Sequence, residues 1–443
     1  MTYRADSTFA NELDQSDLLA RFRRLFHIPI HEDANEGIYL CGHSLGLQPK
    51  SVKAYVDEEL AEWGRLGVEG HFHARHPWMP YHELLTEQTA RLVGARPVEV
   101  VVMNTLTVNL HLMMVSFYRP TQTRHKIVVE SNAFPSDQYA VKSQLRFHGF
   151  DSAEALIELH PREGETSIRT EDIESFLERE GKSVALVMLG GVNYYSGQVF
   201  DMERITRAAH AQGCMVGFDL AHAAGNIPLK LHDWGPDFAV WCSYKYLNAG
   251  PGSSAGCFVH ERHSHSFDLP RFAGWWGTSK AERFKMGPTF EPIPGAEGWQ
   301  ISNPPILPLA ALRASMEIFD EVGMERLRGK SEMLTGYLEY LVDQRLNNRV
   351  RIITLKHVHE RGCQLSLVVS GNARGAFKGL MERGVICDWR EPDVIRVAPV
   401  PLYNSFRDVF EFVNVFREVL EGGGREAGDG RPNTGKRRQE GGG

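Results

Sequence analysis

The sequence predicts an α/β protein, with a mostly parallel β-sheet flanked by helices in a large domain and a smaller α+β domain after it. Short apolar runs alternate with longer amphipathic segments through the middle of the chain, as they do where helices connect the strands of one sheet. A proline-rich run at 303–308 interrupts this alternation, and a second set of helical and strand-like segments follows it. The chain of 443 residues is also longer than one hydrophobic core usually organises.

The apolar runs predict strands and the amphipathic segments between them predict helices. In the large domain, strands are expected at 126–129, 185–189, 215–218, 238–241 and 257–259, and helices at 136–147, 171–180 and 202–212. In the small domain, helices are expected at 309–319, 324–344, 373–383 and 406–420, and strands at 351–354, 365–369 and 394–397.

These elements divide the chain into four parts. Residues 1–45 are expected to form an N-terminal segment that packs with the small domain, 46–305 the large domain, and 306–421 the small domain. Residues 422–443 contain nine glycines and no large apolar side chain. Because such a segment cannot bury a core, we expect it to be a disordered tail.

The composition indicates which binding partners and which cellular compartment to expect. A net charge of -7 gives no reason to expect nucleic acid or an anionic membrane as a partner, and no apolar stretch approaches the length of a membrane span. The N-terminus has neither a signal peptide nor a transit peptide pattern. The six cysteines contain no CxxC pair, which indicates a reduced compartment, with the cytoplasm as the expectation. They are Cys41, Cys214, Cys242, Cys257, Cys363 and Cys387.

Lys245 stands directly after an apolar strand-like run and is followed by Gly250, Pro251 and Gly252. It is therefore expected at a strand end, where α/β sheets place their ligands. A partly desolvated amine at such a position can form an imine with a carbonyl cofactor. A lone lysine is more often a solvated surface residue, so this pattern does not decide the matter by itself.

Asp219 ends another apolar run, 26 residues before Lys245. An unpaired buried carboxylate is costly, so it needs a cationic partner. A protonated pyridine nitrogen would be such a partner and would keep the ring an electron sink. The spacing favours two neighbouring strand ends that face one crevice, but it leaves a structural salt bridge equally open.

Further motifs connect these two segments to a known family. The two central motifs are Asp219-Leu-Ala-His222 and Ser243-Tyr-Lys-Tyr-Leu-Asn-Ala-Gly250. Three motifs precede them: Gly42-His-Ser-Leu-Gly-Leu-Gln-Pro49, Phe134-Pro-Ser-Asp137 and Gly191-Val-Asn-Tyr-Tyr-Ser-Gly-Gln198. Two follow them: Ile301-Ser-Asn-Pro-Pro-Ile306 and Ile395-Arg-Val-Ala-Pro-Val-Pro-Leu-Tyr-Asn404. In this order they resemble the kynureninase family of pyridoxal-phosphate (PLP) enzymes, which have the aspartate-aminotransferase fold, fold type I. The resemblance spans about residues 15–420.

The resemblance implies a PLP site. Lys245 would hold the cofactor and later move protons, and Asp219 would pair with the pyridine nitrogen, with His222 close to the same ring. Phe134 would stack on the ring, in one motif with Pro135, Ser136 and Asp137. The phosphate would be held by Leu106, Thr107, Tyr244, Trp275 and Asn303, the first two through amides at the start of a helix.

The resemblance also implies the reaction. It is hydrolysis of the Cβ–Cγ bond of L-kynurenine or 3-hydroxy-L-kynurenine to L-alanine and anthranilate or 3-hydroxyanthranilate, in tryptophan catabolism and NAD biosynthesis. Lys245, Tyr244 and Asp219 would be catalytic, and Arg396 would clamp the α-carboxylate. The other residues implied in substrate binding are His71, Ser302 and Asn303. The active form would be a homodimer in which Trp275 and Asn303 reach the neighbouring site.

The chain departs from the family pattern in two places. His43 stands where the N-terminal signature usually has asparagine, and the stretch between Lys245 and Trp275 is one residue longer than in the family pattern. We therefore match Trp275 by its Gly-Trp context, with Trp276 as the other candidate.

Three other interpretations fit the sequence less well. The histidines at 71, 73 and 76 and at 260, 263 and 265 lack thiolates or a helical ligand pair, so no metal is expected. A cysteine desulfurase of the same fold would need a cysteine in a mobile loop. A PLP-binding regulator or a catalytically inactive scaffold would have no need to retain Lys245, Asp219 and Arg396 together.

Overall fold

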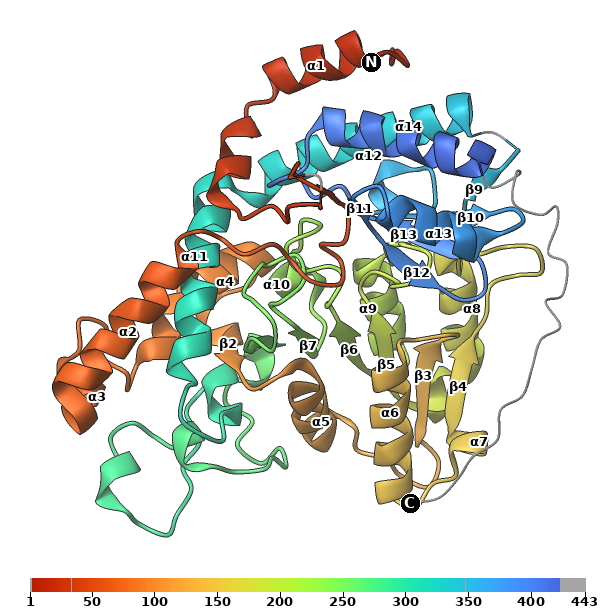
Figure 1. Cartoon of the computed structure of the whole chain (residues 1–443). Helices are drawn as coiled ribbons and strands as arrows, with labels where there is room; N and C mark the ends of the chain where they lie inside the picture. Colours follow the sequence, from red (N-terminus) through yellow and green to blue (C-terminus); the bar gives the residue numbers. More distant parts are fainter. Residues whose placement is uncertain (1, 33, 347, 423–443) are drawn as a thin grey trace, which may run out of the picture.

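The computed structural model describes residues 2–32, 34–346 and 348–422, and Figure 1 shows a large sheet with helices on both faces below a smaller C-terminal unit. The expected disordered tail lies outside the described residues, except for Gly422, which ends α14. Within those described ranges, no helix has both the length and the apolar character needed to cross a membrane.

The large sheet has seven strands in the order β2-β8-β7-β6-β5-β3-β4. Neighbouring strands from β7 to β4 pair in parallel, and β8 runs antiparallel to both β7 and β2. The mostly parallel sheet is thus confirmed, although β2 and β4 had not been predicted. The strands are β2 (Val100–Met103), β3 (Lys126–Glu130), β4 (Leu156–Leu159), β5 (Val184–Gly190), β6 (Met215–Asp219), β7 (Phe238–Trp241) and β8 (Ala255–Val259).

Alternate residues of each strand face opposite layers of helices. On β5, Val187 and Leu189 belong to the core shared with one helical layer, whereas Leu186 and Met188 belong to the core on the other face. Because both faces are covered, the strands read as nearly continuous apolar runs. The first layer contains α4 (Thr86–Val93), α8 (Thr170–Glu180), α9 (Met202–Ala211) and α11 (Ile306–Val322), and the second α5 (Leu106–Phe117) and α6 (Pro135–Phe147).

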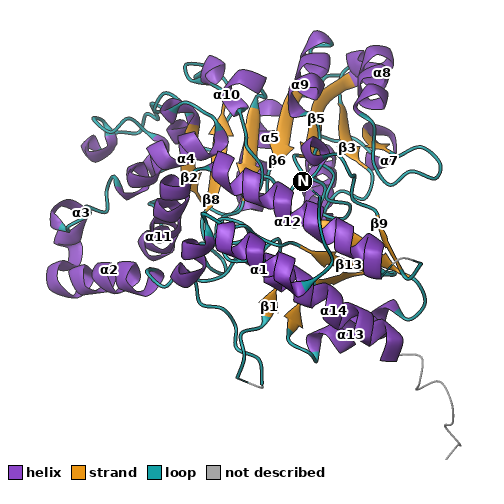
Figure 2. Cartoon of the chain, turned by 90° about the horizontal axis from the view of Figure 1, so that it is seen from above, coloured by secondary structure: helices purple, strands orange, loops and turns teal. Residues whose placement is uncertain are grey.

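The smaller unit is built on an antiparallel four-stranded sheet in the order β12-β13-β10-β9. Ala10 and Leu13 of α1 (Ser7–Ser16) belong to its core, and Figure 2 shows α1 lying along α12 and α14. The domain boundaries given above stay predictions. The helices and strands of the smaller unit are β9 (Val350–Ile352), β10 (Leu365–Val369), β12 (Asp388–Arg390), β13 (Val394–Val397), α12 (Met324–Arg345), α13 (Ala373–Met381) and α14 (Phe406–Gly422).

The N-terminal segment is joined to the smaller unit by β1 (Ile38–Tyr39), which pairs in parallel with β11 (Val385–Ile386). The chain passes from the large unit to the smaller one where α11 runs into α12 through Gly323, whose φ of 76° favours glycine. The expected break at 303–308 is wrong for its last three residues, because α11 begins at Ile306. Pro308 fits into the first turn of that helix, where a backbone N–H has no partner in any case.

Four further α-helices are present in the described part of the chain. They are α2 (Val52–Leu66), α3 (Gly70–His73), α7 (Ser152–Ala155) and α10 (Leu231–Trp234). Of these, α2 and α3 project from the side of the molecule in Figure 1.

Candidate active site

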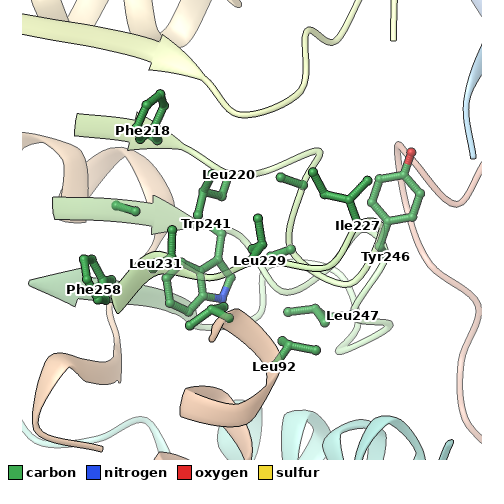
Figure 3. Packing of buried hydrophobic residues seen from close by; sticks show 14 of the residues in the cluster. Leu92, Phe218, Leu220, Ile227, Leu229, Leu231, Trp241, Tyr246, Leu247 and Phe258 are labelled. Atoms are coloured by element: carbon green, nitrogen blue, oxygen red, sulfur yellow. The ribbon is translucent and has the colours of Figure 1, made fainter. Parts of the chain in front are cut away.

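The predicted lysine is fixed by the core beneath it. Lys245 follows β7, and the next two side chains, Tyr246 and Leu247, are almost completely buried. Figure 3 shows both residues in the apolar cluster that also contains Phe218 of β6 and Trp241 of β7. The segment after β7 is therefore anchored on the large-domain core, and Lys245 lies at the carboxyl edge of the sheet, where α/β folds bind ligands.

A cavity of about 130 Å³ opens at this edge. Its lining includes most of the residues expected at the cofactor, namely Leu106, Thr107, Phe134, Ser136, Asp137, Asp219, His222, Tyr244 and Lys245. Of the other lining residues, Val192, Tyr194 and Ala221 belong to the family motifs, whereas the sequence had not pointed to Glu130 and Gly190.

Lys245 lies beside a buried imidazole. Its Nζ is 3.1 Å from Nε2 of His222 and 5.7 Å from the ring centre of Phe134. Burial, and then the charge of Lys245, hold the pKa of His222 well below its usual range. A neutral imidazole can accept from the lysine at Nε2, so the lysine amine is directed into the cavity between these rings.

Three carboxylates gather at the floor of the cavity. Asp219 ends β6 and accepts a hydrogen bond from the Ala221 amide at 2.7 Å, while Oδ1 of the buried Asp137 has no hydrogen-bond partner. Burial raises the pKa of both groups, and Asp219 raises that of Asp137 further. Burial also raises the pKa of Glu130 to about 7.

This acidic group is short of positive charge, because Lys245 is the sole cationic side chain among the lining residues. A protonated ring nitrogen would supply the missing charge, which makes the site fit the pyridine of PLP. Glu130 had a local signal that the sequence analysis missed. Like Asp219, it is an acidic residue at the end of a buried strand, but the predicted strand stopped one residue before it.

The other end of the cavity suits an anion. Helix α5 begins at Leu106, so the amides of its first turn have no partners within the helix. Thr107 Oγ1 lies 2.9 Å from Ser136 Oγ, which brings two hydroxyl groups to the same place. Amides at a helix start together with hydroxyl groups fit the cofactor phosphate.

Arg396 lies behind Tyr194, a residue of the cavity wall. Its side chain is 1% exposed, and it donates to the Tyr194 carbonyl and to Asp388 Oδ2, both at 2.5 Å. The guanidinium is thus buried and held on two sides before any substrate is present.

Five other expected residues do not line this cavity. They are Pro135, His71, Trp275, Ser302 and Asn303. His71 packs edge-on against Trp78, and Trp275 donates from Nε1 to the Arg283 carbonyl at 2.9 Å. Ser302 and Asn303 are exposed.

A strand-end lysine, a buried aspartate, an aromatic ring and the start of a helix meet in one cavity at the edge of this sheet, which is the arrangement of a PLP-dependent enzyme of fold type I. Solved structures share the fold. The cysteine desulfurase CsdA from Escherichia coli is 18% identical, with a TM-score of 0.72 over 91% of this chain and 98% of its own. The cysteine desulfurase from Thermococcus onnurineus NA1 is also 18% identical, with a TM-score of 0.71 over 90% and 100%.

The sequence comparisons are more specific. The model of the kynureninase C-terminal domain matches residues 327–416. The kynureninase of Myxococcus xanthus is 64% identical over 419 residues, covering 95% of this chain and 97% of the relative. That of Koribacter versatilis is 64% identical over 408 residues, covering 92% and 96%. The chain belongs to the kynureninase family.

None of the six cysteines provides the nucleophilic thiol that a cysteine desulfurase would need. Five of the six cysteines are buried and Cys41 is half-buried. Burial raises the pKa of the Cys41 thiol to about 11 and that of Cys363 to about 12. A nucleophilic cysteine needs the opposite, an accessible thiol with a lowered pKa.

Proposed function

We propose that this chain hydrolyses the Cβ–Cγ bond of L-kynurenine or 3-hydroxy-L-kynurenine to L-alanine and anthranilate or 3-hydroxyanthranilate, in the cytoplasm, as a step of tryptophan catabolism and NAD biosynthesis. The observation that carries the proposal is Lys245 at 3.1 Å from His222, in one cavity with the buried Asp219, in a chain 64% identical to a kynureninase over 95% of its length. The test is to add L-kynurenine to the purified protein with PLP and to measure anthranilate and L-alanine in equal amounts.

We assign the cofactor contacts as follows. Asp219 pairs with the ring nitrogen, Phe134 stacks on the ring, and His222 lies close to it. The phosphate is held by Leu106, Thr107 and Tyr244, with Pro135, Ser136 and Asp137 supporting the Phe134 side. When bound, PLP supplies an electron sink for the substrate carbon that loses its proton.

The protein residues then provide proton transfer and orientation. The Lys245 amine, released when the substrate amine takes its place, removes the α-proton and returns a proton later. Burial raises the pKa of Tyr244, so its hydroxyl stays protonated and can donate to an oxygen of the substrate. Arg396 binds the α-carboxylate as a planar fork, which fixes the direction in which the substrate side chain points.

We further propose a homodimer in which Trp275 and Asn303 complete the phosphate site of the neighbouring chain. An exposed apolar cluster around Trp275 supports this interface. Phe72, Trp275 and Phe284 are 54%, 41% and 51% exposed, and the Phe284 ring lies 6.3 Å from Phe72 and 5.5 Å from Trp275. Apolar side chains grouped in this way at a surface favour a protein contact.

Mixed dimers test this arrangement. Lys245→Ala and Asn303→Asp chains should each be inactive, and mixing them should restore about a quarter of the wild-type sites, since half the dimers are mixed and each has one intact site. Lys245→Ala mixed with Asp219→Asn is the control, because both changes lie in the same cavity and no site is repaired. Equal activity in the two mixtures, or a light-scattering mass of one chain, contradicts the proposal.

For substrate choice we propose that 3-hydroxykynurenine is preferred. His71, Ser302 and Asn303 offer an imidazole, a hydroxyl and an amide that could bond to the ring hydroxyl. Once the neighbouring chain of the dimer buries these groups, an unhydroxylated ring would leave them unpaired, which costs about 1–3 kcal/mol and gives a preference of about ten- to a hundredfold.

Competition between the two substrates measures this preference as a ratio of kcat/KM values. His71→Trp should reduce the ratio, whereas His73→Trp, at an exposed position two residues away, should leave it unchanged. Equal kcat/KM values for the two substrates, or a ratio that His71→Trp does not alter, would remove the argument.

A further inference from the structure

His43 is a fully enclosed imidazole without hydrogen bonds. It is 0% exposed, and neither Nδ1 nor Nε2 has a hydrogen-bond partner. Buried polar groups are nearly always paired, so a histidine that is paired at neither nitrogen calls for an explanation. It is also the residue at which the chain departs from its family signature.

The segment that carries His43 lies between the two halves of the active site. On one side, the Gly46 amide donates to the Tyr244 carbonyl at 2.8 Å, next to Lys245. On the other, His43 Nε2 lies 3.6 Å from Oδ2 of Asp388 in the smaller unit. The His43 ring centre is 6.4 Å from that of His222. His43 thus stands close to both the lysine side and the arginine side of the site.

The surrounding charges keep this imidazole neutral. Burial, and then the positive charges of Arg396, Lys245 and Arg390, hold the pKa of His43 well below its usual range. The carboxylate of Asp388, the thiol of Cys41 and the neutral ring of His222 also lie close to it. A neutral imidazole has one N–H to donate.

Asp388 is the acceptor within reach of that N–H. Its Oδ2 already accepts from Arg396 Nη2 at 2.5 Å, from the Ser44 hydroxyl and from Arg390 Nη2 at 3.2 Å, and its Oδ1 pairs with Arg390 at 2.8 Å. When Arg396 turns to a substrate carboxylate, Asp388 Oδ2 loses its Arg396 donor and keeps those of Ser44 and Arg390. Such a loss is costly for a buried carboxylate.

We propose that His43 is a positioning residue for substrate binding, whose Nε2–H donates to Asp388 Oδ2 in place of Arg396 when Arg396 binds the substrate carboxylate. The shift needed is small, because the two atoms are already 3.6 Å apart. The proposal rests on the proposed role of Arg396 and adds the residue that makes Arg396 available.

The test compares variants that keep or remove the donor, using the PLP-loaded enzyme. His43→Leu should raise the Kd of L-alanine, followed by the visible absorbance change on binding, and the KM of the substrate by about tenfold, with kcat within about twofold. His43→Asn, whose amide can donate, should stay within about twofold of wild type. Affinity for L-alaninamide, which has no carboxylate, should not change in any His43 variant.

His125→Leu is the matched control, since His125 also has a buried, unpartnered Nδ1 and stacks on Phe150 away from the cavity. If His43→Leu does not fold, His43→Ala gives the same comparison. Unchanged L-alanine affinity without the donor, or equal weakening for L-alaninamide, overturns the proposal.

Arg396→Met separates this inference from the assigned function. If Arg396→Met weakens L-alanine binding and His43→Leu does not, the His43 role alone fails. If Arg396→Met has no effect, the assignment of Arg396 fails as well.

Discussion

Replacing Lys245 with alanine should abolish the visible absorbance band that borohydride reduces, and should lower turnover by at least about a thousandfold. The variant loses both the amine that binds the cofactor and the base that moves the α-proton, and proton transfer by a placed group alone contributes about 10²–10⁴-fold. The His222 imidazole, 3.1 Å away in the native protein, remains but cannot form the imine.

The control is Lys182→Ala, at an exposed lysine, which should keep both the band and the activity. The measurement is an absorbance scan before and after borohydride, followed by mass spectrometry of the chain. A cofactor adduct that persists in Lys245→Ala would place the reactive amine on another residue.

Asp219→Asn should still bind PLP but lose about 10²–10⁴-fold in turnover. The amide oxygen of asparagine can accept from the Ala221 amide, as Oδ1 of Asp219 does at 2.7 Å, so the local backbone should hold. What disappears is the negative charge that keeps the ring nitrogen protonated, and with it the capacity of the ring to accept electrons.

Asp233→Asn, at an exposed aspartate of α10, provides the control and should behave as wild type. Cofactor affinity by equilibrium dialysis and turnover should be measured separately, because the expected loss lies in turnover. An Asp219→Asn enzyme with near-normal turnover and the native spectrum would remove the assigned role of this carboxylate.

The sequence predicted the five inner strands of the large sheet and missed the two edge strands, β2 and β4. β5, β6 and β7 are buried almost throughout, so their apolar runs stand out. β4 was missed because it lies at the sheet edge and reads Leu-Ile-Glu-Leu, with three of its four side chains half-buried. Such a short, mixed segment has no period that separates it from a loop.

The site residues also differ in how far the sequence alone could predict them. Lys245 and Asp219 follow buried strands of one parallel sheet, so local pattern and topology were enough to bring them to one edge. Arg396 comes from the other unit, about 150 residues beyond Lys245, and no local periodicity links the two. His71, Trp275, Ser302 and Asn303 were reached through family motifs alone, and within one chain they lie outside the lining of the cavity.

The acidic floor of the cavity has a consequence for the amount of folded enzyme. Glu130, Asp137 and Asp219 are each less than a tenth exposed, and a bound cofactor relieves their repulsion only in the folded chain. Mass action therefore ties stability to cofactor supply, by about 2.7 kcal/mol when the free cofactor is a hundredfold above its Kd. Scarcity of the vitamin from which PLP is made would then lower the number of folded enzyme molecules, as well as the fraction of them that carries the cofactor.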